Sequence, residues 1–390
     1  MERKQCTKLN QIENNRVADL NQIENNRAAD NTTVSQLIQS PNDYSRYIMR
    51  KWLAVFVLFA VMLGTMLLSV SVGAARLPVH EIFRVLMGGG EDASRTIILN
   101  VRIPRVFTAV SVGIALAMAG SVMQSVLQNP LASASTLGIS QGASFGAAVA
   151  IVYFEAGVQA GIASGAMVMA ANPFTVTIFA FVGGISTTAL ILLLSYRSGA
   201  VPATMVLAGV AIGAMFTGAT ALVQYFADDV RVGSIVYWTF GNLARPGWRE
   251  IRILSFLNLA GFMYFIFNRW NYNAMESGTH TAKSLGVNVD VLVLVSMVVS
   301  TLISATAIAF VGTIGFIGLI APHIVRKFVG NDYRFVIPCS ALMGATVMLA
   351  ADITSRMVRA PAVLPIGALT SFLGAPLFLY MIIKKGNIAK

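Results

Sequence analysis

Three histidines are the residues whose side chains would most often bind a metal ion. His323 lies in the segment APHIVR, and no second His, Cys or carboxylate stands at ligand spacing from it. His80 and His280 are similarly isolated, and Cys6 and Cys339 show no pairing pattern. The sequence therefore predicts no metal site and no disulfide framework, and it favours a structural or loop-capping role for His323.

The acidic residues are placed at the ends of long apolar runs or in loops, as with Glu155, Asp290 and Asp352. Carriers that are driven by protons or sodium usually need such groups buried at depth, so their absence there argues against ion-coupled transport. There is no G-x-x-x-x-G-K-[ST] phosphate loop. No nucleophile, base and orienting group occur together, so we expect no enzyme. If ATP supplies the energy, a separate subunit must bring it.

The elements that would position these residues are long apolar helices. Of the 390 residues 56% are hydrophobic and only 12% are charged, with a mean hydropathy of +0.71. Runs of about 18 or more apolar residues are candidate membrane helices. About ten such spans are predicted, at 52–72, 106–127, 131–153, 173–195, 203–226, 251–268, 290–309, 313–329, 335–355 and 366–383. The third and the eighth are the least regular, because Gly and Pro interrupt them. We therefore predict an all-α integral membrane protein.

Small residues follow one face of the second predicted span. Gly113, Ala117 and Gly120 form a small-xxx-small pattern, which lets helix backbones approach closely. Packing explains this pattern better than a direct substrate role does.

Residues 1–45 form a polar extension ahead of the membrane domain at 46–390. It contains a tandem 11-residue near-repeat, LNQIENNRVAD at 9–19 and LNQIENNRAAD at 20–30. Two Asn-rich copies offer too little apolar surface to fold alone, so we expect a flexible or partly helical tail.

Basic residues indicate the topology. An even number of spans places both termini on one side, and the flanking Arg46, Arg50, Lys51, Lys384 and Lys385 favour the cytoplasm for that side. The arginines are ambiguous, but every lysine falls on this side. The net charge of +11 is spread over short connections and forms no stripe for nucleic acid.

Several segments together resemble the permease subunits of the iron-siderophore, haem and cobalamin importers, over roughly residues 50–385. The segments are RIPR at 102–105, the glycine-rich stretch 120–146, VLAGVAIG at 206–213, YWTFGNL at 237–243, GFIGLIAPHIVR at 315–326 and the stretch 349–380. Their number, order and spacing carry the resemblance.

The resemblance implies the type II importer fold of ATP-binding-cassette (ABC) transporters, with about ten helices in each permease. It implies a second permease subunit, identical or paralogous, two ATPase subunits that use ATP and magnesium, and an extracytoplasmic substrate-binding protein. The chain itself would bind no cofactor and would lie in the bacterial cytoplasmic membrane among lipid, with both termini cytoplasmic. The cargo would be an iron(III)-siderophore or a related metal chelate, with haem and cobalamin as alternatives.

The resemblance also implies roles for individual residues. Arg102, Arg105 and Arg356 match positions that pair with acidic residues of the binding protein, which suits the bidentate grip of guanidinium on carboxylate. Headgroup anchoring is the alternative. The coupling segment that docks on the ATPase would include Ala282, Lys283, Leu285 and Gly286. The translocation path would be lined by Val206, Gly209, Gly213, Trp238, Gly241 and Asn242.

The sequence is also compatible with two other kinds of membrane protein. An ion-coupled secondary transporter would also have many spans, and uptake driven by an ion gradient alone would identify it. A non-transporting scaffold or receptor would move no substrate in reconstituted vesicles.

Overall fold

The computed structural model describes residues 41–72, 84–85, 87–89, 92–154, 172–198, 202–359 and 362–386, and every regular element among them is helical. The elements are α2 (Pro41–Ser71), α4 (Asp92–Thr96), a π-helical turn (Ile97–Arg102), α5 (Ile103–Val126), α6 (Ile139–Tyr153), α7 (Pro173–Ser198), α8 (Pro202–Tyr225), α9 (Asp229–Thr239), α10 (Trp248–Phe267), α11 (Arg269–Glu276), α12 (Thr279–Ser284), α13 (Val289–Val311), α14 (Ile317–Val329), α15 (Tyr333–Met357) and α16 (Ile366–Gly386). The all-α fold class is confirmed.

The chain divides into two units, Met1–Leu53 and Ala54–Lys390. The described part of the first unit is the beginning of α2, which exposes Tyr47, Met49 and Trp52. The repeat at 9–30 lies outside the described residues. All contacts discussed below are within the second unit.

Within the described residues, seven helices are long and apolar enough to cross a membrane: those at Ser45–Ser71, Ser94–Val126, Pro173–Arg197, Thr204–Tyr225, Trp248–Phe267, Val289–Val311 and Tyr333–Met357. The apolar helix at the C-terminal end is shorter by this measure, Ile366–Tyr380. The two segments expected to be least regular are broken: α6 has 15 residues and begins at Ile139, and α14 has 13 and begins at Ile317. At 1.5 Å per residue each extends only about 20 Å, less than the ~30 Å hydrocarbon core.

The non-helical segments ahead of α6 and α14 are held by hydrogen bonds within the protein. The Thr136 hydroxyl donates to the carbonyl of Leu131 at 2.9 Å, and the Thr313 hydroxyl donates to that of Thr239 at 2.5 Å. Irregular backbone at membrane depth is tolerated where protein surrounds it. The runs 131–153 and 313–329 were therefore correctly recognised as apolar, but only part of each is helical.

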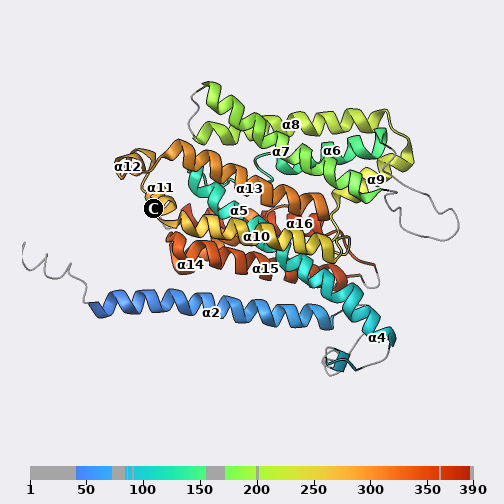
Figure 1. The fold of residues 1–390 in the computed structure, drawn as a ribbon, viewed down its shortest axis with the longest axis horizontal. Coiled ribbons are helices and arrows are strands. Elements are labelled where there is room, and N and C mark those ends of the chain that lie inside the picture. The colour runs from blue at the N-terminus through green and yellow to red at the C-terminus, as the bar shows by residue number, and fades with distance from the viewer. Residues whose placement is uncertain are drawn as a thin grey trace, which may run out of the picture. The chain divides into compact units, whose positions relative to one another are not determined.

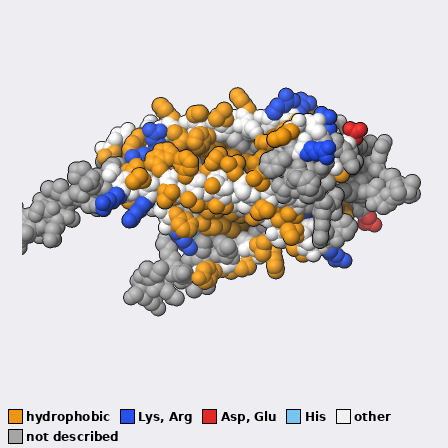
Figure 2. Space-filling model, turned by 90° about the horizontal axis from the view of Figure 1, so that it is seen from below, with side chains coloured by type: hydrophobic (Ala, Val, Ile, Leu, Met, Phe, Trp, Pro, Cys, Tyr) orange, Lys and Arg blue, Asp and Glu red, His pale blue; other side chains and the backbone are white. Residues whose placement is uncertain are grey.

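Helix α5 is the most enclosed of the candidate spans, with 83% of its most apolar window buried. It packs against α10, α13, α14 and α15 (Figure 1). Helices α6, α7, α8 and α9 form a second group, which α13 joins to the first through α6 and α7. The face in Figure 2 shows hydrophobic side chains across its middle and Lys and Arg toward its two ends, as a multi-pass membrane protein requires.

Glycines set how closely the helices around α5 approach. A methyl group on Gly113 would overlap the carbonyl of Gly344 in α15, and one on Gly120 would overlap the carbonyl of Gly318 in α14. The packing role predicted for the small face of α5 is confirmed.

We expect Gly120→Ala to destabilise the protein by about 1–3 kcal/mol, because its methyl group has no room against the backbone of α14. The matched control is Gly64→Ala in α2, where nothing lies within 4 Å of the new methyl group. Since alanine stabilises a helix by up to ~1 kcal/mol relative to glycine, the control substitution should leave the stability unchanged or raise it. Unfolding temperatures in detergent test both variants, and equal stability would contradict the close contact.

Candidate functional site

A buried carboxylate organises the end of the bundle where α5 begins and α15 finishes. Asp352 is fully buried, Arg105 donates from Nε to its Oδ1 at 2.8 Å, and Arg105 Nη2 lies 2.8 Å from the same oxygen. Arg356, one helical turn further along α15, places Nη2 2.8 Å from the other carboxylate oxygen. A buried carboxylate is costly unless cations surround it, and here two guanidinium groups do so.

Arg356 and Arg102 also cap α2. The last carbonyls of a helix have no partner within it. Arg102 Nη1 donates to the carbonyl of Val70 at 2.7 Å, and Arg356 donates to those of Ser69, at 3.0 Å, and Val72, at 2.5 Å. Positive charge at this position also complements the helix dipole.

We call this group, Arg102, Arg105, Arg356 and Asp352, the arginine cluster. All three arginines predicted to dock a binding protein lie in it, so the structure brings them together. Their guanidinium groups are largely buried and bonded within the chain. With three arginines and one carboxylate, the arginine cluster nevertheless keeps a net positive charge.

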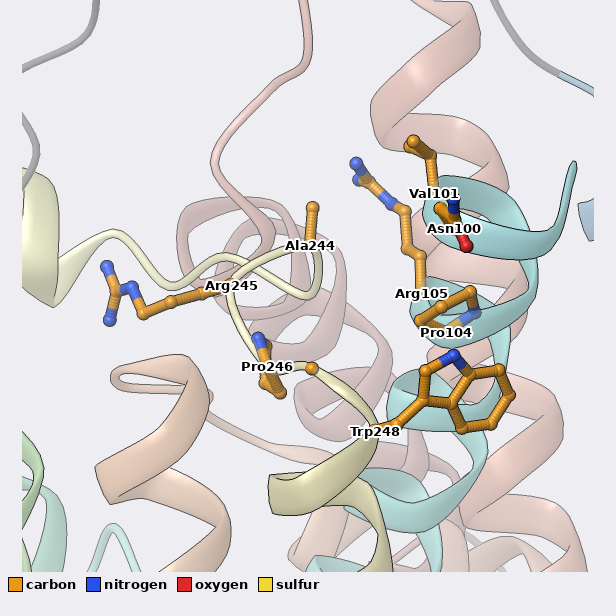
Figure 3. A pocket seen from close by; sticks show the side chains of 9 residues that line it. Asn100, Val101, Pro104, Arg105, Ala244, Arg245, Pro246 and Trp248 are labelled. Atoms are coloured by element: carbon orange, nitrogen blue, oxygen red, sulfur yellow. The ribbon is translucent and has the colours of Figure 1, made fainter. Parts of the chain in front are cut away.

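A cavity of about 350 Å³ opens beside the arginine cluster (Figure 3). Its walls come from the start of α5 and from the loop before α10, and include Asn100, Pro104, Arg105, Arg245 and Trp248. The Arg245 side chain is exposed and points away from Arg105, whereas the Trp248 ring lies below Pro104. The cavity thus has a basic, partly aromatic lining.

At the other end of α15 the short helices α11 and α12 lie between α10 and α13. Because Tyr333 and Asp352 are 19 positions apart in one helix, the two ends are separated by about 28 Å. Leu285 is 68% exposed just after α12. The exposed Lys283 lies 3.9 Å from Asp290, and Gly286 ends the turn with a φ of +85° that glycine adopts readily.

The four predicted coupling residues therefore divide into two groups. Lys283, Leu285 and Gly286 lie on the outside, where a partner can reach them. Ala282 is fully buried and its carbonyl accepts from the Val287 amide at 3.0 Å, so it holds the turn in place.

Helix α11 is anchored by buried polar groups. The Tyr272 hydroxyl lies 2.8 Å from that of Ser296 in α13, and burial raises the pKa of this tyrosine, which keeps its proton. Burial alone would raise the pKa of Asp332, but hydrogen bonds from Arg334 and Asn273 outweigh it and hold that pKa below its usual value. Asp332 thus remains an anion that caps α15, accepting from the Arg334 amide at 3.1 Å.

The path residues predicted in α8 lie on its packed face. Gly209 and Gly213 approach the backbone of Leu137 and Gly138, and Val206 is 8% exposed. The exposed face carries other apolar side chains, among them Leu207, Val210, Met215 and Leu222. If α8 lines a path, these side chains and not the predicted ones face it.

The path residues after α8 pack against the break between α13 and α14. Trp238 is 6% exposed, and its carbonyl leaves no room for a side chain at Gly312. Gly241 has a φ of +73°, and the Asn242 amide donates to the carbonyl of Val311 at 2.7 Å. The structure thus places all three against this break.

His323 lies 6.2 Å from the ring of Phe378, edge to face. Across the described residues, no group of three His, Cys, Asp or Glu side chains could hold a metal ion.

Sequence reasoning missed several residues. In the sequence Asp352 is only an acid at a span end, Arg245 is one of many arginines, and Tyr333 and Arg326 carry no predicted role, although Arg326 closes the motif that contains His323. The available signal was that motif, whose last residue is a charge inside an apolar segment.

Comparison with known proteins covers most of the chain. The FecCD transport family matches residues 59–384. An iron(3+)-hydroxamate import system permease protein of Bacillus subtilis is 32% identical over 349 residues, covering 88% of this chain and 87% of that protein. A Methanocaldococcus jannaschii protein named as an ABC transporter permease is 47% identical over 344 residues, covering 88% and 98%.

The fold is also similar to a solved structure, described as an inward-facing conformation of a metal-chelate type ABC transporter. The TM-score is 0.73 at 30% identity, over 85% of this chain and 98% of the other. The expected relationship is confirmed by sequence and fold together. This chain belongs to the FecCD transport family and is a permease of the ABC transporter type.

Proposed function

We propose that this permease moves an iron(III)-siderophore or a related metal chelate across the cytoplasmic membrane by alternating access, with both of its termini in the cytoplasm. The proposal rests on one observation, that the two ends of the helix bundle differ in charge and in exposed side chains. One end holds the arginine cluster and its basic cavity, and the other presents α12 with Leu285 exposed. A chelate that carries negative charge and an acidic docking protein both suit the first end.

The energy source comes from outside the chain in this proposal. The acidic residues of the seven candidate spans are Glu250, Asp290 and Asp352, all near span ends. Asp352 forms ion pairs with Arg105 and Arg356, so this proposal gives it a structural role and no role in ion coupling. Two ATPase subunits, binding ATP and magnesium, would dock on the two α12 helices of a permease pair.

The uncovered face of α8 supports a second permease subunit. Its apolar side chains have no covering element in the described part of the chain, and they run along the helix in one stripe. A second copy, or a paralogue, would enclose the path between two such faces. Large exposed apolar patches commonly mark an interface or a lipid-facing surface.

Reconstituted vesicles test the function. The permease, its ATPase subunit and its binding protein should take up iron-55-labelled ferric hydroxamate in an ATP-dependent, vanadate-sensitive manner. Haem and cobalamin, tested in parallel, identify the chelate class. Uptake driven by a proton or sodium gradient without ATP would contradict the proposal, as would the absence of uptake for every chelate.

If the binding protein docks at the end that holds the arginine cluster, Arg245→Glu should weaken its binding strongly. Arg245 is exposed beside the cavity, so reversing its charge should leave the fold intact. We expect the affinity for the binding protein to fall about tenfold and its salt dependence to weaken. Arg197→Glu, an exposed arginine at the end of α7, is the matched control. Equal binding by both variants would exclude docking at this cavity.

A further inference from the structure

The hydroxyl of Tyr333 is within hydrogen-bond distance of residues from three other helices. Its side chain is fully buried at the start of α15. Arg326 of α14 donates to the hydroxyl from Nη2 at 2.8 Å. The hydroxyl in turn donates to Glu276 of α11 at 3.1 Å or to the carbonyl of Ser121 in α5 at 3.3 Å.

Helix α11 is bonded to the same place through Asn273. Its amide oxygen accepts from the Tyr333 amide at 2.7 Å, and its amide nitrogen donates to Asp332 at 3.2 Å. Asn331 adds a bond to Glu276 at 3.0 Å. A short helix of eight residues would not hold a fixed position alone, and these bonds fix it to α15.

Arg326 extends the contact into α5. Its Nη1 donates to Gln124 Oε1, and Gln124 Nε2 approaches the carbonyl of Gly318 in α14 at 3.4 Å. We call Gln124, Asn273, Glu276, Arg326 and Tyr333 the Tyr333 joint. Gln124 and Tyr333 are buried, Asn273 and Arg326 are half-buried, and Glu276 is exposed at the edge of the joint. Polar networks with a buried centre fix a unique arrangement when their members are satisfied.

The other end of α14 is strained. Phe316, immediately before the helix, has a φ of +66°, in the left-handed region that a bulky side chain rarely adopts. The strained residue follows the break at Gly312, whose neighbour Thr313 is bonded to the end of α9. Strain of this kind persists only where the surroundings impose it, and it clusters at switching regions.

We propose that the Tyr333 joint transmits movement of α11 and α12 to α14, and through the strained break at 312–316 to the end of α9. The five residues are positioning residues of the transport cycle. The inference rests on the proposed function, because it takes the ATPase to be what moves α12.

A cysteine on α9 reports the transmitted movement without any need to know the cargo. Tyr237 is 60% exposed. We place Tyr237→Cys in a Cys6→Ser background and measure maleimide labelling of the permease–ATPase complex in nanodiscs, without nucleotide and with ATP plus vanadate. We expect ATP plus vanadate to change the labelling rate about fivefold, and Tyr333→Phe to reduce that change to less than about twofold.

Three further variants separate transmission from simple stability. Thr188→Val removes another buried hydroxyl contact, 2.8 Å from Thr301, and should keep the full labelling response. Glu276→Gln keeps an acceptor for the Tyr333 hydroxyl and should behave as the parent, whereas Glu276→Leu should behave as Tyr333→Phe. A purely structural role would lower ATP hydrolysis and thermal stability in Tyr333→Phe but leave the nucleotide response of the folded complex unchanged.

A full response in Tyr333→Phe, or no response to nucleotide in the parent, overturns the inference. The proposed function is judged separately by ATP-driven uptake in vesicles. Uptake with an unaffected response in Tyr333→Phe would reject the joint alone, and a normal response without uptake of any chelate would reject the proposed function.

Discussion

Asp352→Asn is expected to destabilise the permease by about 3–5 kcal/mol, because it leaves two buried guanidinium groups without their counter-ion. Arg105 and Arg356 both contact this carboxylate at 2.8 Å, and the carboxylate is fully buried. The other partners of Arg356 are largely backbone carbonyls at the end of α2, which cannot neutralise its charge. Unfolding in detergent, followed by loss of helical signal, measures the change.

Two controls separate the buried pair from a general effect of losing a carboxylate. Asp290→Asn removes an acid that is 88% exposed and lies 3.9 Å from Lys283, so it should cost less than about 1 kcal/mol. Adding Arg356→Met to Asp352→Asn removes one stranded charge and should recover part of the loss. If Asp352→Asn and Asp290→Asn are equally mild, the arginine cluster does not stabilise the fold.

The arginine cluster changes how docking can be tested. Charge reversal at Arg105 or Arg356 would place a second carboxylate against Asp352 and disturb the fold. Loss of binding in such a variant would then have two explanations. Arg245 lies beside the same cavity but is exposed, so it separates recognition from stability.

The positions of the membrane helices could be predicted because length and hydropathy alone identify them. The two broken segments were recognised as irregular from their Gly and Pro residues. The bonds that hold the breaks were not predictable, since the partners of Thr313 and Val311 come from the end of α9 and the loop that follows it.

The apolar sequence of α8 does not indicate which face of the helix is packed and which is exposed. This helix is hydrophobic on all sides, so its packed and exposed faces look alike in sequence. The sequence therefore predicts Gly209 and Gly213 to line a path, whereas in the structure they pack against Leu137 and Gly138. Likewise, Arg105 and Asp352 meet across 247 positions only because α5 packs along α15. No local pattern indicates such a pair.

Leu285→Asp is expected to abolish association with the ATPase subunit. Leu285 is 68% exposed at the tip of α12, where its side chain is free to enter an apolar contact with a partner. A carboxylate placed in an apolar contact must be desolvated without a counter-ion, and truncation of a central interface residue alone costs about 2 kcal/mol or more. That corresponds to a loss of affinity of roughly thirtyfold, and the charged variant should exceed it.

Co-purification of the tagged permease with its ATPase subunit measures this association, and Leu285→Ala should give an intermediate result. Tyr196→Ala is the matched control, because Tyr196 is also a large exposed side chain, 88% exposed near the end of α7, but lies outside α12. The binding protein should still dock on Leu285→Asp, since the arginine cluster lies at the far end of α15, about 28 Å along that helix from Tyr333. Unchanged ATPase association in Leu285→Asp would show that α12 is an ordinary connection and that the ATPase contacts another surface.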